Sequence, residues 1–319
     1  MLNNPALLAT RAVLNATLTG CEVHRTGGTL WTGRAKSNKL SRACAFAVLL
    51  LIANPTIGVA MDQTFQSSGV AIRYTDDGDG APVLLIHGYT GTADMWVETG
   101  TTAMLTEHFR VIAVDCRGHG QSGKPDGAAY GLEMVEDLAR LLDALDISEV
   151  AVVGYSMGAE IGLRLAVEDP NRVRSIVIGG SGWSGEADAN NYKKLASSLE
   201  EEASFGPMAR AMTQAGQPEP TAEDIEAMDQ MLQGQDVPAL IGVARGMAEI
   251  VNLSTDEVSA IAVPVLGITG EHDAERGNVE KLKGAIPDYT LIVLPGRDHM
   301  SAMSDPQFND TMLEFLSAG

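Results

Sequence analysis

Residues 150–158 read VAVVGYSMG, an apolar run of strand-forming residues that ends in a serine between two glycines. The following residues, 159–169, read AEIGLRLAVED and favour a helix with apolar positions at Ile161 and Leu165. Ser156 therefore falls where a buried strand turns sharply into a helix. Small neighbours suit such a turn because backbones approach each other closely there. This geometry makes Ser156 the candidate nucleophile.

The pentapeptide around Ser156 could also be an ordinary glycine-rich turn, because the chain contains 34 glycines. Further motifs decide between these readings. Four other segments adjoin or close apolar runs, namely HGYTG at 87–91, DCRGHGQS at 115–122, GEHD at 270–273 and GRDH at 296–299. A serine followed by an acid and then a histidine is the chain order in which a catalytic triad is assembled on an α/β sheet.

Together the segments HGYTG, DCRGHGQS, GYSMG, GEHD and GRDHM resemble the α/β-hydrolase fold family, in the branch of serine esterases, lactonases and cofactor-free haloperoxidases. The resemblance extends over residues 64–316 and implies an eight-stranded, mostly parallel sheet flanked by helices. It is specific for the fold and the catalytic machinery and says little about the substrate.

The resemblance also implies which side chains carry the chemistry. Ser156 would be the nucleophile, His299 the base and Asp273 the acid that orients the base. Glu271 and Asp298 are alternative acids, but Asp298 is adjacent to His299, where neighbouring side chains seldom align for such a bond. A serine rather than an aspartate at the nucleophile position disfavours the haloalkane dehalogenase and epoxide hydrolase relatives.

The loop at residues 87–91 follows an apolar run at 83–86 and lies where an oxyanion hole needs a backbone amide. We expect the N–H groups of Tyr89 and Met157 to be the two donors. His87 is expected to order this loop by hydrogen bonding, and not to be the base.

An all-helical segment is expected after the sixth strand. Residues 183–253 contain only helical patterns, separated by prolines, at 191–203, 222–232 and 239–251. The resemblance places a cap over the active site at this position. The α/β core would then comprise residues 61–182 and 254–319.

Three residues are expected to line the substrate pocket: Trp183 at the mouth of the site, Trp96, and Met300 beside the base. Trp96 lies in a single helix expected over residues 92–105. The cap also carries five methionines, which favour packing over ligand contact, although a soft apolar cap would suit a loosely selective site.

Composition limits the possible partners. The 319 residues are 45% hydrophobic, enough for a large core in one domain with an insertion. Only one of the 42 acidic residues but six of the 22 basic ones lie in residues 1–60, so the remainder carries a net charge of −25. Such a surface repels nucleic acid and anionic membranes, so we expect neither as a partner and instead a small-molecule ester as substrate.

Neither metals nor other cofactors are expected. No cluster of histidines and acids has metal-ligand spacing, and no glycine loop of the phosphate-binding type is present. Of the three cysteines, Cys21 and Cys44 lie before residue 60, which leaves Cys116 without a partner for an internal disulfide. Cys116 is expected to be a partly buried small residue.

The first sixty residues resemble an export signal. Three basic residues at 36–42 precede the apolar run ACAFAVLLLIA at 43–53, and small residues follow at 58–60. This layout predicts a secretory signal peptide cleaved after Ala60, and hence an exported protein; a retained membrane anchor is the alternative. Residues 1–35 depart from the pattern, which indicates either a downstream translation start or a long leader.

The leading functional hypothesis is a hydrolase of small or medium carboxylic esters that uses an acyl-enzyme. Lactone hydrolysis and perhydrolysis are close variants. Hydrolysis of a carbon–carbon bond in dienol acids is a rival hypothesis. It needs a positively charged side chain to bind the substrate carboxylate, and the cap offers Lys193, Lys194, Arg210 and Arg245. A ligand-binding, receptor-like protein with slow turnover is a rival of another class.

Overall fold

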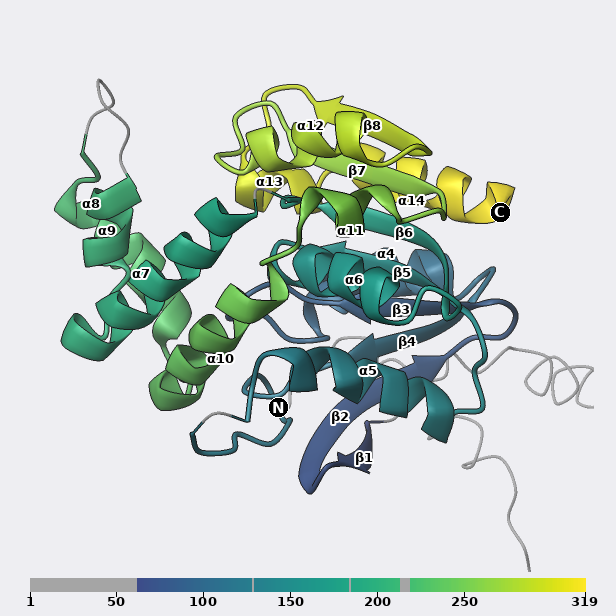
Figure 1. Cartoon of the computed structure of the whole chain (residues 1–319), viewed down its shortest axis with the longest axis horizontal. Coiled ribbons are helices and arrows are strands. Elements are labelled where there is room, and N and C mark those ends of the chain that lie inside the picture. The colour runs from purple at the N-terminus through teal and green to yellow at the C-terminus, as the bar shows by residue number, and fades with distance from the viewer. Residues whose placement is uncertain (1–61, 128, 184, 213–218) are drawn as a thin grey trace, which may run out of the picture. The chain divides into compact units, whose positions relative to one another are not determined.

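The computed structural model describes residues 62–319 apart from 128, 184 and 213–218, and it leaves undescribed the side chains of 186–188 and 211–212. In this part of the chain an eight-stranded sheet has helices on both faces, as Figure 1 shows. The expected fold class is therefore confirmed. The expected signal peptide and its cleavage site after Ala60 lie outside the described residues.

The strands follow one another in the order β1-β2-β4-β3-β5-β6-β7-β8 across the sheet. Strands β1 and β2 pair antiparallel, as do β2 and β4, and every other pair is parallel. Their bounds are β1 (Gln63–Ser67), β2 (Val70–Asp77), β3 (Pro82–Ile86), β4 (Arg110–Val114), β5 (Val150–Tyr155), β6 (Val173–Gly179), β7 (Val265–Gly270) and β8 (Tyr289–Leu294). The carboxyl ends of the parallel strands therefore meet at one edge, where ligands bind in open α/β sheets.

Helices cover both faces of the sheet, which explains why its central strands read as continuous apolar runs. In β3, Leu84 and Ile86 face one hydrophobic cluster, and Val83 and Leu85 face the other. The first cluster includes α5 (Leu132–Ala144), α6 (Met157–Glu168), α11 (Thr255–Ser259) and α12 (Arg276–Ala285); the second includes α3 (Met95–Glu98), α4 (Thr101–Leu105), α13 (His299–Met303) and α14 (Pro306–Ala318).

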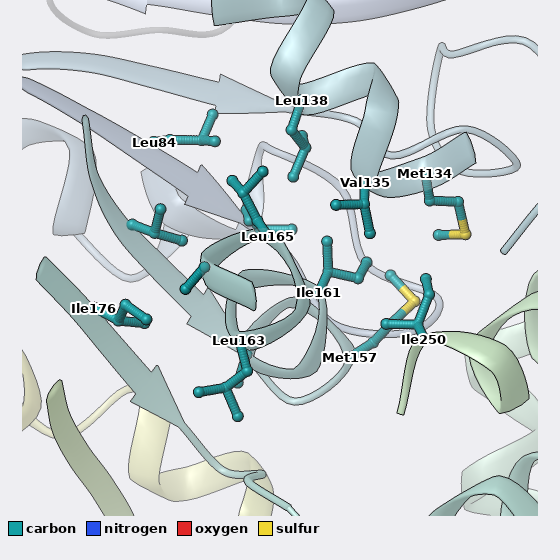
Figure 2. Close-up of a cluster of buried hydrophobic side chains, with 14 of the residues drawn as sticks. Leu84, Met134, Val135, Leu138, Met157, Ile161, Leu163, Leu165, Ile176 and Ile250 are labelled. Atoms are coloured by element: carbon teal, nitrogen blue, oxygen red, sulfur yellow. The ribbon is translucent and has the colours of Figure 1, made fainter. Parts of the chain in front are cut away.

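Helix α6 is buried on nearly every side, and this burial fixes the position of the residue before it. Ile161 and Leu165 lie between the sheet and α5, close to Leu138, as Figure 2 shows. Met157, at the start of α6, lies near Ile250 of the following helical segment. Both Met157 and Ile161 are 0% exposed. The turn that carries Ser156 is thus held between two well-packed elements.

The helix expected over residues 92–105 is instead two short helices, α3 and α4, so that prediction was wrong. Gly100 separates them in the left-handed conformation, with φ of 76° and ψ of 0°. Glycine adopts this conformation without steric cost and commonly ends a helix.

Between β6 and β7 the described residues form helices and loops only. The helices are α7 (Glu186–Glu202), α8 (Gly206–Met212), α9 (Ala222–Asp229), the short 3-10 helix η1 (Gln230–Leu232), α10 (Val237–Ile250) and α11. Residues of α7, α10, η1 and the loop before α8 form a hydrophobic cluster of their own. We call residues 183–253 the helical insertion.

Helix α8 was not among the three helical patterns expected for this segment, because prolines such as Pro207 were taken to separate them. Pro207 instead lies in the first turn of α8, where its missing N–H has no intrahelical partner to lose. Among the helices of the described residues, none is both long and apolar enough to cross a bilayer.

Candidate active site

Ser156 lies at the sharp turn between β5 and α6. Its backbone has φ of 53° and ψ of −119°, an unfavourable conformation for a residue with a side chain. The Ser156 N–H donates a hydrogen bond of 2.7 Å to the carbonyl oxygen of Gly179, which secures the turn to β6. The strain is thus held by the surrounding elements and places the hydroxyl at the carboxyl edge of the sheet.

The two glycines of the turn are required by close backbone contacts. A Cβ atom on Gly154 would lie 2.2 Å from the carbonyl oxygen of Gly158. A Cβ atom on Gly158 would lie 2.1 Å from the carbonyl oxygen of Ile86. No side chain fits at either distance without movement of the backbone, so the expectation of small residues here is confirmed.

The imidazole of His299 lies within hydrogen-bonding distance of both Ser156 and Asp273. His299 Nε2 is 3.1 Å from Ser156 Oγ, and His299 Nδ1 is 3.1 Å from each carboxylate oxygen of Asp273. A carboxylate accepts hydrogen bonds, so Nδ1 carries the hydrogen and Nε2 is left to accept the serine proton. These three side chains follow β5, β7 and β8, and so arise from three strands that end at the same edge.

The environment keeps His299 basic. Burial lowers the pKa of His299, but the hydrogen bond to Asp273 and the negative charges of Asp273, Glu275 and Asp298 together raise it by more, so the pKa lies above its ordinary value. The side chain of Asp273 is 0% exposed and that of His299 is 32% exposed. The acid is therefore shielded from water while the ring remains open to a substrate.

The alternative acids have other partners. Asp298 is the N-cap of α13, and its Oδ1 accepts hydrogen bonds from the N–H groups of Met300 and Ser301 at 3.2 and 2.8 Å. Glu271 Oε2 accepts a hydrogen bond of 2.8 Å from the N–H of Gly296. Of the three acids considered, Asp273 is the one that contacts the imidazole.

The two residues expected to supply oxyanion donors lie next to Ser156 in the chain or in the wall of its cavity. Met157 is the first residue of α6, so the helix makes no use of its N–H. Tyr89 lines the same cavity as Ser156. The hydroxyl of Tyr89 donates a hydrogen bond of 2.8 Å to the carbonyl oxygen of Leu240 in α10, and this bond joins the loop to the helical insertion.

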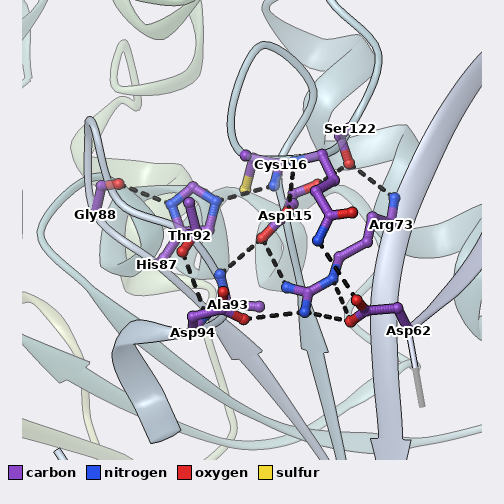
Figure 3. A network of polar contacts seen from close by, with 12 residues as sticks. Asp62, Arg73, His87, Gly88, Thr92, Ala93, Asp94, Asp115, Cys116 and Ser122 are labelled. Carbon is purple, nitrogen blue, oxygen red and sulfur yellow. Dashed lines mark hydrogen bonds and ion pairs between the residues drawn. The ribbon is translucent and has the colours of Figure 1, made fainter. Parts of the chain in front are cut away.

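His87 orders the 87–91 loop by hydrogen bonds to the backbone, as expected, and does not act as the base. Its Nδ1 lies 2.7 Å from the carbonyl oxygen of Gly88, and its Nε2 accepts a hydrogen bond of 3.0 Å from the N–H of Cys116. Both contacts are drawn in Figure 3. Burial lowers the pKa of His87, which keeps the ring neutral. Cys116 is itself buried, and burial raises the pKa of its thiol.

A buried carboxylate, Asp115, joins the same loop to the sheet (Figure 3). Its Oδ1 accepts hydrogen bonds from the N–H of Ala93 at 2.7 Å and from Nη1 of Arg73 at 3.2 Å. Arg73 also pairs with Asp62 and Asp94, which are both well exposed. This network holds the end of the 87–94 loop against β2 and the residue that follows β4.

Two adjoining cavities open around Ser156 and His299, and both are lined in addition by Tyr192, Leu195, Met208 and Met228. We call the first, of about 320 Å³, the polar half; its polar lining includes Glu160, Ser181, Asn191, Tyr192, Asp273 and Glu275. We call the second, of about 510 Å³, the methionine half; its methionines are Met95, Met208, Met228, Met231, Met300 and Met303. A larger cavity of about 690 Å³ lies between α10 and the 124–130 loop and includes none of the expected site residues.

Comparison with known proteins agrees with this geometry. Residues 81–206 match the family model described as the alpha/beta hydrolase fold. The chain belongs to the α/β-hydrolase fold family. The eight-stranded, mostly parallel sheet and the serine at a strand-to-helix turn both agree with this family.

Three relatives of this α/β hydrolase are named as hydrolases or as an esterase. It is 38% identical over 117 residues to 2-hydroxy-6-oxo-2,4-heptadienoate hydrolase of Pseudomonas putida, an alignment that spans 36% of this chain and 42% of that protein. It is 29% identical over 254 residues to a putative carbamate hydrolase RutD of Variovorax paradoxus, across 75% of this chain and 92% of that one. It matches the structure of a thermophilic esterase of Thermogutta terrifontis with a TM-score of 0.66 and 26% identity, covering 81% and 99% of the two chains.

The expected pocket residues of this α/β hydrolase lie in three different places. Met300 lines the methionine half and is 62% exposed. Trp96 is 0% exposed and belongs to the second core cluster, which also includes Leu105 of α4 and Phe308 of α14, so the expectation that it lines the pocket was wrong. Trp183 lines neither half; its Nε1 donates a hydrogen bond of 2.9 Å to the carbonyl oxygen of Leu253 and joins the two ends of the helical insertion.

The site also contains three residues that the sequence analysis missed. Tyr155, the last residue of β5, donates a hydrogen bond from its hydroxyl to the carbonyl oxygen of His299 and so holds the backbone of the base. Glu160 and Tyr192 contact each other in the polar half. One pattern could have revealed Glu160: it is an acid near the start of a helix whose every face is needed for packing. Within the described residues, no group of three or more metal-ligating side chains is arranged to hold an ion.

Proposed function

We propose that this protein is a serine hydrolase that cleaves small or medium carboxylic esters through an acyl-enzyme on Ser156. The observation that carries the proposal is the hydrogen-bonded series Ser156–His299–Asp273 in the lining of a cavity. A serine hydroxyl is a poor nucleophile until a base removes its proton during attack. The series supplies that base and orients it.

The reaction follows from the positions of the groups. As Ser156 Oγ bonds to the ester carbonyl carbon, its proton passes to His299 Nε2, and the carbonyl oxygen becomes an oxyanion between the N–H groups of Tyr89 and Met157. His299 then gives the proton to the departing alcohol, and the carbon–oxygen bond of the ester breaks. Water repeats the sequence on the acyl-enzyme, which releases the acid and restores the serine. Asp273 stabilises the ring while it is charged.

The charges around the cavity favour esters over the dienol acids of the carbon–carbon bond hydrolases. A dienoate carries a carboxylate, yet the described residues that line the two halves include no lysine or arginine. Arg245 pairs with Glu200 at 2.7 Å, and Lys193 and Lys194 line a separate hollow along α7. Arg210 lies 3.7 Å from Glu202. Lactone hydrolysis and perhydrolysis remain variants of the same acyl-enzyme chemistry, and slow turnover in a receptor-like protein is the alternative of another class.

The proposal is tested by active-site labelling and turnover together. A fluorophosphonate should label the purified protein at Ser156 with one equivalent, and Ser156→Ala should abolish the label and reduce p-nitrophenyl acetate turnover by about 10⁴-fold or more. A panel of esters, lactones and dienol acids then ranks the substrates by kcat/KM. Labelling at another residue would overturn the assignment of the nucleophile. A dienol acid that outranks every ester would overturn the assignment of the bond.

We further propose that the protein is exported and that its mature chain begins at Met61. The support is the order of a basic stretch, an apolar run and small residues within 36–60. N-terminal sequencing of the protein from its native host should give Met61, and a sequence that begins within 1–35 would contradict the proposed cleavage.

A further inference from the structure

Glu160 is a carboxylate in the wall of the active-site cavity that the ester mechanism does not use. It follows Ser156 by one turn of α6 and lines the polar half together with Ser156 and His299. It is 7% exposed, so more than nine-tenths of the residue is buried. Its remaining exposure faces the cavity that the nucleophile also faces.

Two hydroxyl groups hold this carboxylate in place. Ser181 Oγ donates a hydrogen bond of 2.9 Å to Oε1, and the Tyr192 hydroxyl donates one of 2.5 Å to Oε2. Both oxygens accept, which is the arrangement expected of an ionised carboxylate. Because Ser181 follows β6 and Tyr192 lies on α7, the side chain is fixed from the sheet and from the helical insertion at once.

Acidic side chains line the polar half. They are Glu160 and Glu275 besides the catalytic Asp273, and the described lining residues include no lysine or arginine. A buried, low-dielectric wall strengthens the interaction of a fixed carboxylate with whatever charge enters the cavity.

The methionine half has a different character. Its walls are dominated by methionines and by Tyr155, Leu195 and Phe205, and its one acid, Glu98, is exposed. Methionine side chains adapt to apolar groups of varied shape. The two halves adjoin at Ser156 and His299, so a bound ester would place one of its two ends in each.

We propose that Glu160 is a specificity-determining residue. Its carboxylate selects esters that place a cationic group in the polar half while their apolar end occupies the methionine half. This inference rests on the proposed ester hydrolysis. Glu160 also joins α6 to the helical insertion through Tyr192, and a role confined to that contact would affect all esters alike. Selectivity between charged and neutral esters of equal shape therefore separates the two roles.

Two pairs of isosteric esters measure this selectivity. The first pair places the charge in the alcohol: choline butyrate against 3,3-dimethylbutyl butyrate. The second places it in the acid: methyl 4-(trimethylammonio)butyrate against methyl 5,5-dimethylhexanoate. Each pair differs only by nitrogen in place of carbon, so the ratio of kcat/KM within a pair reports charge and cancels any general loss of activity. A preference of about tenfold or more for the cation is expected in at least one pair.

Variants then test whether Glu160 causes the preference for the cationic ester. Glu160→Gln keeps the size of the side chain and should reduce the ratio about tenfold, close to one. Glu201→Gln is the matched control, because it removes the same charge from an exposed position on α7 that lines neither half. It should leave the ratio unchanged, whereas an equal loss would show that the overall negative charge of the protein attracts cations.

The outcomes distinguish this inference from the proposed function. Equal kcat/KM values within both pairs for the unmodified protein would overturn the inference, need no variant, and leave ester hydrolysis standing. A preference that persists in Glu160→Gln would also overturn it. Failure of all four esters, with no fluorophosphonate label on Ser156, would instead overturn the proposed function and this inference with it.

Discussion

Replacing Asp273 by asparagine tests how the base is oriented, because the change removes one charge and adds one donor. The Glu275 N–H donates a hydrogen bond of 2.9 Å to Asp273 Oδ1, so the amide oxygen of asparagine would occupy that position. The amide nitrogen then takes the place of Oδ2, which lies 3.1 Å from His299 Nδ1. A donor would then face Nδ1 beside the amide oxygen, which is also 3.1 Å from that nitrogen, so the tautomer with its hydrogen on Nε2 becomes favoured. In that tautomer Nε2 cannot accept the proton of Ser156.

The magnitude follows from burial and geometry. The side chain of Asp273 is 0% exposed, so water does not take over its role. An acid-to-amide change that imposes the wrong tautomer in a serine triad reduces kcat by about 10⁴-fold, or about 5 kcal/mol in activation free energy. We expect a loss of this size in kcat for p-nitrophenyl acetate, with KM changed much less, because substrate contacts are untouched.

Asp298→Asn provides the matched control, one residue before the base. Asp298 caps α13, and asparagine caps a helix about as well as aspartate. This variant should retain kcat within about threefold, since its charge acts on His299 only from a distance. If Asp298→Asn proved as severe as Asp273→Asn, or if Asp273→Asn kept more than a tenth of the activity, the assignment of the acid would be refuted.

Three further results are expected. Burial lowers the pKa of His299, but Asp273 and the neighbouring acids together raise it by more, so kcat/KM should fall on acidification through a pKa above about 6.5; a pH profile with its acid limb below that value would contradict the assignment. Gly158→Ala places a Cβ atom 2.1 Å from the Ile86 carbonyl oxygen and should lower the free energy of unfolding by about 3 kcal/mol or more in urea titration; an unchanged midpoint would refute the close contact. Trp96→Ala should cost about 3–5 kcal/mol of stability, and kcat/KM should stay within about threefold for the folded protein; a selective loss of activity would return Trp96 to the pocket.

The sheet and the serine turn could be predicted from sequence because their causes are local. The run at 150–158 has strand-forming residues followed by small ones, and the packing that demands Gly154 and Gly158 is the same packing that defines the turn. His87 was correctly expected to order its loop, since its position at the end of a buried strand leaves nearby backbone groups as its partners.

The break between α3 and α4 and the direction of the Trp96 side chain were harder to predict. Trp96 was expected to line the pocket from one helix over residues 92–105, but that segment forms the two short helices α3 and α4, and the Trp96 side chain is buried in the core. Periodicity over 92–105 gave no warning, because the left-handed turn at Gly100 depends on one residue. A single glycine in a helical pattern is compatible with either outcome.

The walls of the cavity could not be predicted because they are made by contacts between distant segments. Tyr192 of α7 reaches Glu160 of α6, and the backbone of Leu240 in α10 accepts a hydrogen bond from Tyr89 in the oxyanion loop. Each contact depends on how α7 and α10 pack together over the sheet, which no local pattern encodes. Short motifs within the core therefore determine the chemistry at Ser156, whereas selectivity depends on the position of the helical insertion. Changes at the contacts of the insertion should accordingly alter the choice of substrate more readily than the reaction itself.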